Sequence, residues 1–271
     1  MRILYLGDVV GRSGRDALVE KLPDIRRRLK VEFVIVNAEN AAHGFGITAK
    51  ICEDLYAAGA DVVTLGNHSW DQREIIPYID SDPRLLRPLN YPTGTPGRGV
   101  GTFLSARGRR VMVVQVMGRL FMDALDCPFA AAERELAKVR LGGGKLDAIL
   151  VDVHAEASSE KMALAHSLDG RVSAVVGSHS HIPTADTQIL PGGTAYQTDA
   201  GMCGDYDSVI GMKKDAAIFK LVRKMPGERL SPAEGPATLC GVLIETDERS
   251  GLAVRAQPLR VGPRLAEVWP A

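Results

Sequence analysis

Short apolar runs that do not alternate with polar residues recur through the first two-thirds of the chain. They are rich in Val, Ile and Leu and occupy residues 3–6, 33–36, 62–65, 111–116, 148–153 and 174–176. Such runs are typical of strands that are covered on both faces. Three later runs, at residues 216–222, 239–244 and 252–255, are predicted to complete the same sheet or to form a second one.

Helix-length amphipathic stretches separate these runs. They span residues 15–29, 48–58, 129–139 and 160–168, the last entered through Ser158 and Ser159. The first is predicted to bend at Pro23, which lacks the amide that a helix interior needs. Thr48 is the predicted N-cap of the second, and Gly59 its C-terminal stop. The alternation of strands and helices predicts an α/β fold with mostly parallel central strands.

Two segments interrupt this alternation and are expected to be long loops. Residues 83–101 contain four prolines among several glycines, and residues 191–211 are rich in glycine. Loops of this length in compact domains are often functional. Neither segment resembles a linker, so we expect one domain over residues 1–271.

Composition excludes several classes of partner. The formal net charge is +0, so the chain has no overall field that would attract a polyanion. Aromatic residues make up only 5%, which disfavours a stacking surface for extended nucleic acid. The opening residues are not expected to form a signal peptide, and no apolar run is long enough for a bilayer. The four cysteines are scattered without a C-x-x-C pair, as expected of a cytoplasmic protein with no membrane partner.

Polar side chains follow five of the predicted strands at the point where each strand ends. Ligands bind at the carboxyl ends of the strands in open α/β sheets. Carboxylate, amide and imidazole groups together suit divalent manganese, iron or zinc. The residues concerned are Asp8, Asn37, Glu39, Asn40, Asn67, His68, His154, His179 and His181.

Turn formation alone explains Asp, Asn, Gly or Ser at any one of these strand ends. It does not explain the histidines, because four of the six in the chain lie there. The joint pattern therefore favours a metal site over a set of unrelated turns.

Three glycine-containing motifs carry a family resemblance. GDVVG (7–11), GNH (66–68) and GSHSH (177–181) resemble the dispersed motifs of the calcineurin-like metallophosphoesterases, and His154 stands where that superfamily has its isolated histidine. NAEN (37–40), HAEASSEK (154–161) and YDSVIGM (206–212) are similar to its YmdB-like branch, bacterial cyclic nucleotide phosphodiesterases. The resemblance extends from Asp8 to about Met212 and implies a layered α/β/β/α sandwich.

The resemblance implies two metal ions, with iron or manganese favoured and zinc also suited. One would be held by Asp8, Glu39, Asn40 and His181, and the other by Glu39, Asn67, His154 and His179. The superfamily's usual Asp-x-His is replaced by Asp8-Val9-Val10, so that one histidine ligand is missing and Asn40 is its expected replacement. The shared carboxylate, usually Asp, would be Glu39.

The resemblance also suggests a catalytic residue. His68 follows the ligand of the GNH motif and would act as general acid, the alternative being that it only orients that ligand. Of the weaker candidates, His43 would face substrate or solvent, Glu156 would support the site or begin a helix, and Arg12 would form a salt bridge. His166, in the middle of a helix, is expected to be structural.

The activity implied is hydrolysis of 2′,3′-cyclic nucleotides by a metal-bridging hydroxide, in a pocket walled by residues 83–101 and 191–211. A phosphomonoesterase or an RNA-processing nuclease is the first alternative. A nuclease needs a basic groove, whereas Arg26, Arg27, Arg28 and Lys30 are better explained as a solvated helix end. The second alternative is a regulatory protein that binds a nucleotide or partner with little turnover. The sequence leaves a homo-oligomer open.

Overall fold

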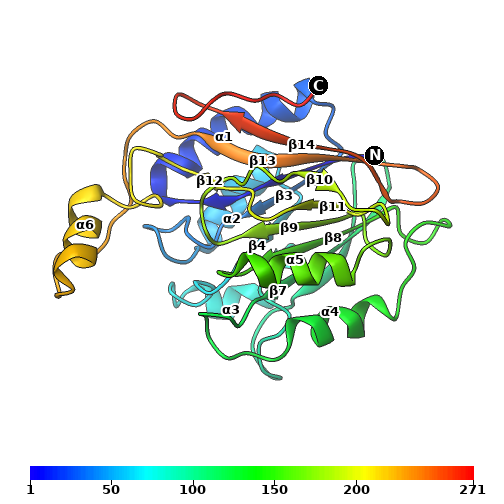
Figure 1. The fold of residues 1–271 in the computed structure, drawn as a ribbon, viewed down its shortest axis with the longest axis horizontal. Helices are drawn as coiled ribbons and strands as arrows, with labels where there is room; N and C mark the ends of the chain where they lie inside the picture. The colour runs from blue at the N-terminus through cyan, green and yellow to red at the C-terminus, as the bar shows by residue number, and fades with distance from the viewer.

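Two six-stranded sheets lie face to face in the computed structural model, which describes residues 1–271 (Figure 1). The strands are β1 (Arg2–Leu6), β2 (Asp8–Val9), β3 (Phe33–Asn37), β4 (Val62–Thr64), β5 (Leu85–Leu86), β6 (Val100–Leu104), β7 (Arg110–Met117), β8 (Ala148–His154), β9 (Ala174–Ser178), β10 (Gln188–Ile189), β11 (Ala195–Gln197), β12 (Met202–Cys203), β13 (Leu239–Thr246) and β14 (Ala253–Val261). The first sheet has the order β14-β13-β1-β3-β4-β5 and the second β10-β11-β9-β8-β7-β6, while β2 and β12 pair separately.

The centres of both sheets are parallel, and antiparallel strands are added at one edge of the first sheet and at both edges of the second. In the first sheet β1, β3, β4 and β5 run parallel, and β13 and β14 are added antiparallel at one side. In the second sheet β7, β8, β9 and β11 run parallel, with β6 and β10 antiparallel at the two edges. The parallel strands therefore end on the same side within each sheet.

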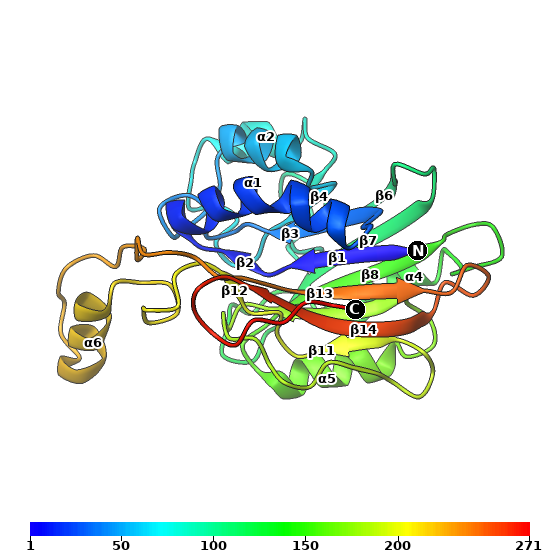
Figure 2. The ribbon, with the colours of Figure 1, turned by 90° about the horizontal axis from the view of Figure 1, so that it is seen from above.

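Helices cover the outer face of each sheet, which gives four layers (Figure 2). The helices are α1 (Gly11–Arg28), α2 (Ala49–Ala58), α3 (Ile75–Ile79), α4 (Pro128–Leu136), α5 (Ser158–Ser167) and α6 (Lys214–Arg223). One apolar cluster joins α1 and α2 to the first sheet, a second lies between the sheets, and a third joins the second sheet to α4 and α5. The predicted α/β/β/α sandwich is confirmed. None of the helices combines the length and apolar character needed to cross a membrane.

Local signals in the sequence explain where α2 begins and ends. The Thr48 hydroxyl accepts a hydrogen bond from the amide of Ile51 at 3.3 Å, as an N-cap does. Gly59 ends the helix in the left-handed region at φ 113°, where a side chain would be strained. In α1, by contrast, the helix begins at Gly11, earlier than predicted, and Pro23 lies within it.

Three predictions about local structure are wrong. Residues 216–222 form most of helix α6 and not a strand, because apolar residues at i, i+4 spacing, such as Ala217 and Leu221, make a helical face. The predicted loop 83–101 contains β5 and the start of β6, and the predicted loop 191–211 contains β11 and β12. Most of these strands are only two or three residues long, too short to give a pattern.

Candidate metal centre

The polar residues at the strand ends come together where the two sheets meet. Asp8 opens β2 directly after β1, while Glu39 and Asn40 follow β3 and Asn67 follows β4. The second sheet supplies three histidines, because His154 ends β8, and His179 and His181 follow β9. The carboxylates and amides thus lie just after strands of the first sheet, and the imidazoles lie at or just after the ends of strands of the second.

One ring nitrogen lies at the centre of this group. His154 Nε2 is 3.1 Å from Glu39 Oε1, 2.9 Å from Asn67 Oδ1 and 3.1 Å from His179 Nδ1. Glu39, His154 and His179 offer ligand atoms that all lie within 4.8 Å of one another. A single N–H cannot satisfy three neighbours, whereas a cation among them at about 2.0–2.2 Å from each would.

Three buried oxygens of the cluster accept no hydrogen bond. They are Asp8 Oδ1, Glu39 Oε1 and Asn40 Oδ1. Leaving buried polar atoms without partners costs about 1–3 kcal/mol each, so each requires an explanation. Gly66 brings the backbone so close that a Cβ there would lie 2.3 Å from His154 Nε2. A cation bound by these oxygens explains both features, so the donor set fits a metal.

The side chains of Asn40 and His181 are each held by a hydrogen bond to a backbone carbonyl. The Asn40 amide donates to the carbonyl of Gly44 at 3.0 Å, and this leaves its oxygen directed elsewhere. His181 Nδ1 lies 2.7 Å from the carbonyl of Ile210, which fixes the proton on that nitrogen and leaves Nε2 with its lone pair. Both groups therefore keep a metal-binding atom available.

Burial and mutual attraction shift the pKa values of the cluster in opposite directions. Burial raises the pKa of Asp8 to about 6, against the opposing effect of His181 and His154. Burial would also raise the pKa of Glu39, but His154 outweighs it and lowers the value to about 2. For His154 burial is outweighed by Glu39, which raises its pKa to about 9, whereas burial and the charge of His154 lower that of His179 to about 3. His179 thus presents a neutral imidazole, the form that binds metals.

A buried chain of hydrogen bonds behind His154 was not predicted from the sequence. His154 Nδ1 lies 2.9 Å from Ser178 Oγ, which donates to Asp152 Oδ1 at 2.8 Å. Asp152 Oδ2 accepts from the Thr64 hydroxyl at 2.6 Å, which ties the second sheet to the first. The chain orients the imidazole so that Nε2 faces Glu39. The charged Asp152 inside an apolar run, two positions before His154, is the signal that could have revealed it.

The backbone that carries two of the histidines is strained. His179 and His181 have φ values of 97° and 66°, in a region that L-residues rarely adopt. Asp199 supports this turn by accepting the amide of Ser180 at 2.9 Å, and Lys161 Nζ donates to the same carboxylate oxygen at 2.8 Å. Both charged side chains are at most 1% exposed. The buried pair therefore holds the histidine turn in place.

Substitution of Lys161 by Met is expected to lower the free energy of unfolding by about 3–5 kcal/mol, because it leaves the Asp199 carboxylate buried and without its cation. Urea unfolding followed by circular dichroism measures the change. Lys138→Met is the matched control, since Lys138 reaches Glu135 over the same 2.8 Å with a side chain that is 60% exposed. We expect no measurable change in the control. Equal losses in the two variants would contradict the assigned role of the buried pair.

His68 lies beside the cluster with one ring nitrogen engaged. Its backbone amide donates to Glu39 Oε2 at 2.9 Å, and its Nδ1 is 2.7 Å from Asp71 Oδ2. The ring of Phe45 packs edge-on against it with centroids 5.0 Å apart. Nε2 makes no hydrogen bond within the chain and remains available to a bound molecule. Asp71, three residues further along the chain, was not predicted to take part.

The weaker candidates have different positions. Glu156 Oε2 lies 3.1 Å from His179 Nε2, so it supports the cluster from outside. Arg12 forms the expected salt bridge, with Asp16 at 3.3 Å, and also lines a cavity of about 470 Å³ together with His43. His166 is exposed in the last turn of α5.

The cavities next to His68 are walled by a segment other than the predicted loops. His68, Asp71 and Phe45 line a cavity of about 440 Å³ that is closed by Lys220 and residues 226–230. Neither this cavity nor the one lined by His43 contains a residue of 83–101 or 191–211, and neither is lined by a proposed metal ligand, so the walls expected over the metal centre stay a prediction. Residues 226–230 could not be predicted to line this cavity, because they lie far from His68 in the sequence and have no regular secondary structure.

The basic cluster at the end of α1 is engaged within the protein. Arg26 donates to the carbonyls of Gly59 and Glu32 and lies 3.1 Å from Asp61. Arg27 pairs with Asp24, and the guanidinium of Arg28 stacks 3.7 Å above the Trp269 ring. These contacts leave no basic groove of the kind that a nuclease needs at this helix end.

Comparisons with known proteins give the same family and related activities. A family model described as YmdB-like protein matches residues 4–259. The chain is 46% identical over 261 residues to a 2′,3′-cyclic-nucleotide 2′-phosphodiesterase of Bacillus subtilis (strain 168), covering 96% of this chain and 97% of that protein. It is 32% identical over 266 residues to a putative phosphatase/phosphodiesterase of Mycoplasma pneumoniae, covering 96% and 93%.

Two solved structures share the whole fold. A hypothetical protein from Thermus thermophilus superposes with a TM-score of 0.90 at 44% identity, over 97% of this chain and 100% of that chain. A structure described as a novel phosphatase of Mycoplasma pneumoniae superposes with a TM-score of 0.88 at 32% identity, over 97% and 93%. The match extends from the sandwich core to the strand ends that carry the candidate centre.

Proposed function

Because the chain belongs to the YmdB-like protein family, we propose that it is a metal-dependent phosphodiesterase that hydrolyses 2′,3′-cyclic nucleotides. The name of the Bacillus subtilis relative supports the substrate class. The geometry supports the chemistry, since hydrolysis of a phosphate diester needs a cationic centre and a proton donor, and the candidate metal ligands and His68 lie close together.

The observation that carries the proposal is the set of three buried oxygens without donors, beside two imidazole nitrogens. Asp8, Glu39 and Asn40 supply the oxygens, and His154 and His179 the nitrogens. No thiolate takes part, because Cys203 and Cys240 are buried, and burial raises the pKa of each thiol. An oxygen and nitrogen set of this kind suits manganese or iron, and also zinc.

The proposed ligands divide into two groups that share Glu39. One ion would be held by Asp8, Glu39, Asn40 and His181, and the other by Glu39, Asn67, His154 and His179. When bound, such ions activate water and neutralise charge on the phosphate oxygens. With two divalent ions bound, the two carboxylates would leave the centre with an excess of positive charge to attract the phosphate, which the neutral chain as a whole cannot do.

His68 is the proposed proton donor for the ribose oxygen that leaves. Water adds to phosphorus and releases one proton, one phosphorus–oxygen bond of the ring breaks, and the leaving oxygen takes the proton from Nε2; the proton released by water returns to Nε2 through solvent. The Asp71 carboxylate accepts the proton of Nδ1, so Nε2 is the ring nitrogen that faces the substrate and donates when the ring carries both protons. The Glu39 carboxylate fixes the backbone of His68 through its amide, so the proton donor and the metal ligands keep a constant separation.

A substrate panel tests the proposal. Protein purified without chelator and analysed for bound metal is assayed with 2′,3′-cyclic AMP, bis-nitrophenyl phosphate and nitrophenyl phosphate. We expect kcat/KM for the cyclic diester to exceed that for the monoester by at least about 100-fold, since the site has to distinguish a diester from a dianion. A higher kcat/KM for the monoester than for the cyclic diester would assign the chain as a phosphomonoesterase. Binding of the cyclic nucleotide without turnover by metal-loaded protein would assign it as a regulatory protein.

A further inference from the structure

The proposed proton donor fixes the side of the centre on which the nucleoside lies. His68 Nε2 donates to the ribose oxygen that leaves, so the ribose and its base lie on the His68 side. The cavity of about 440 Å³ that His68 and Phe45 line, which we call the inner cavity, is on this side. Its volume falls within the range of roughly 300–1,000 Å³ that is typical of ligand pockets. The Phe45 ring gives a nucleobase an aromatic surface for stacking.

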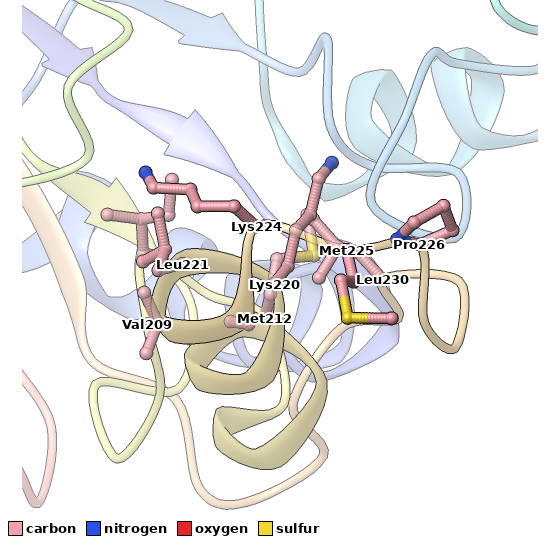
Figure 3. A pocket seen from close by; sticks show the side chains of 10 residues that line it. Val209, Met212, Lys220, Leu221, Lys224, Met225, Pro226 and Leu230 are labelled. Carbon is pink, nitrogen blue, oxygen red and sulfur yellow. The ribbon is translucent and has the colours of Figure 1, made fainter.

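The apolar hollow beside α6 is a poorer place for the base. It has a volume of about 590 Å³ and is lined by seven hydrophobic residues, among them Leu221 and Met225 (Figure 3). It contains neither His68 nor an aromatic ring, and its charged side chains are Lys220 and Lys224. It therefore offers no stacking partner for the base and no proton donor for the ribose.

A second cavity, of about 470 Å³, adjoins the inner cavity, and we call it the outer cavity. Asp71, Arg229 and Leu230 line both, so these side chains form the boundary between the two. Asp71 Oδ2 is 2.7 Å from His68 Nδ1, which puts the outer cavity one side chain away from the proton donor. A nucleoside in the inner cavity thus leaves room for a group attached to it.

One cation at this boundary has no partner. Arg12 and Glu234, which also line the outer cavity, are paired with Asp16 at 3.3 Å and with Lys213 at 3.5 Å. The guanidinium of Arg229, by contrast, forms no ion pair or hydrogen bond within the chain and is exposed. A planar guanidinium binds phosphate through two parallel hydrogen bonds. The position of Arg229 therefore suits a phosphate that is attached to the nucleoside in the inner cavity.

Building on the proposed function, we propose that the chain acts on 2′,3′-cyclic nucleotides with a second phosphate at the 5′ oxygen, as at the 3′ end of a cleaved RNA strand. The terminal nucleoside lies in the inner cavity, Arg229 binds the 5′ phosphate, and the preceding nucleotide enters the outer cavity. His43, which the sequence places near substrate or solvent, lines that cavity.

The bonds that form and break are those of the mononucleotide reaction. Water opens the cyclic phosphate and leaves a phosphomonoester on the last ribose, while the link to the preceding nucleotide stays intact. A single backbone phosphate is bound outside the centre, which agrees with a chain of net charge +0 that has no field for a long polyanion.

Three substrates test the proposal with metal-loaded protein: 2′,3′-cyclic AMP, its 5′-phosphorylated form, and the dinucleotide ApA ending in a 2′,3′-cyclic phosphate. We expect kcat/KM for the dinucleotide to exceed that for cyclic AMP by at least about 10-fold, through the charged hydrogen bonds to Arg229. A value for the 5′-phosphorylated mononucleotide above that for the dinucleotide would overturn the RNA end in favour of a free nucleotide. Cleavage between the two nucleosides, seen by chromatography, would also overturn it.

Arg229→Gln is expected to lower kcat/KM for the dinucleotide by at least about 10-fold more than for cyclic AMP, because only the dinucleotide has a 5′ phosphate to lose its partner. Misfolding or loss of metal would slow both substrates equally. Arg134→Gln is the matched control, since Arg134 is also exposed and unpaired but lies on α4, and should leave both values unchanged.

Two results would overturn this assignment while leaving the cyclic phosphodiesterase intact. One is a wild type that hydrolyses the dinucleotide no faster than cyclic AMP, and the other is an Arg229→Gln variant that keeps the preference for the dinucleotide. Failure of the metal-loaded wild type to hydrolyse any of the three substrates would instead contradict the proposed function, and the RNA-end substrate with it.

Discussion

Glu39→Gln is expected to lower turnover of the cyclic nucleotide by about 10³-fold and to lower the bound metal with it. The substitution keeps the shape of the side chain and removes the charge that both proposed ions share. Glu39 Oε1 is buried without a hydrogen bond, so no solvent can replace the lost carboxylate. Steady-state kinetics and elemental analysis of the same protein sample give both quantities.

Glu156→Gln is the control for Glu39→Gln. Glu156 also lies 3.1 Å from a histidine of the cluster, but its carboxylate is 53% exposed and contacts the outer nitrogen of His179. We expect a loss of about 10-fold, typical of a group that only supports a ligand. If Glu39→Gln retained its metal and its turnover, the shared-ligand assignment would be wrong, whatever the substrate proves to be.

His68→Ala is expected to lower kcat for 2′,3′-cyclic AMP by about 10²–10⁴-fold while the bound metal stays constant. Nε2 of the ring donates its proton to the leaving oxygen and contacts none of the proposed metal ligands, and the backbone amide that contacts Glu39 is unchanged by the substitution. The nitrophenolate of bis-nitrophenyl phosphate leaves without needing a proton. We therefore expect the loss on that substrate to be at least about 10-fold smaller.

This difference between substrates separates the two roles considered for His68. A residue that merely oriented Asn67 would lose metal on substitution, and it would slow both substrates equally. His166→Ala is the control, because His166 is exposed on α5 and should leave metal and turnover unchanged. Equal losses on both substrates would remove His68 from the role of proton donor.

The central strands could be predicted because both of their faces are buried. Apolar runs at residues 148–153 and 174–176 can be recognised without knowing which strands pair with them, and β8 and β9 confirm both predictions. Strands of two residues, such as β5 and β12, give no such pattern and depend on their neighbours. The single-domain organisation stays a prediction.

The residues of the candidate site that follow the strand ends could be predicted from the sequence. Parallel topology brings the ends of β1, β3, β4, β8 and β9 together, and that follows from the order of the runs. The residues that hydrogen bond to the proposed ligands and to their supporting turn could not be predicted. Serine and lysine, such as Ser178 and Lys161, have no special structural role at most positions in a chain. Their contacts with His154 and Asp199 depend on side-chain positions that only the packed sheets define.

The layer of side chains between the two sheets has a consequence for the centre at its end. Carboxylates and amides are attached to one sheet and imidazoles to the other, so the thickness of that layer fixes the gap between the two halves. Tyr5 and Phe33 fill it, both without exposed surface. A change of one methylene deep in this layer forces side chains and backbone to shift. We therefore expect substitutions inside this layer to alter the spacing of the proposed ligands, and with it the preferred ion, although these residues touch neither ion nor nucleotide.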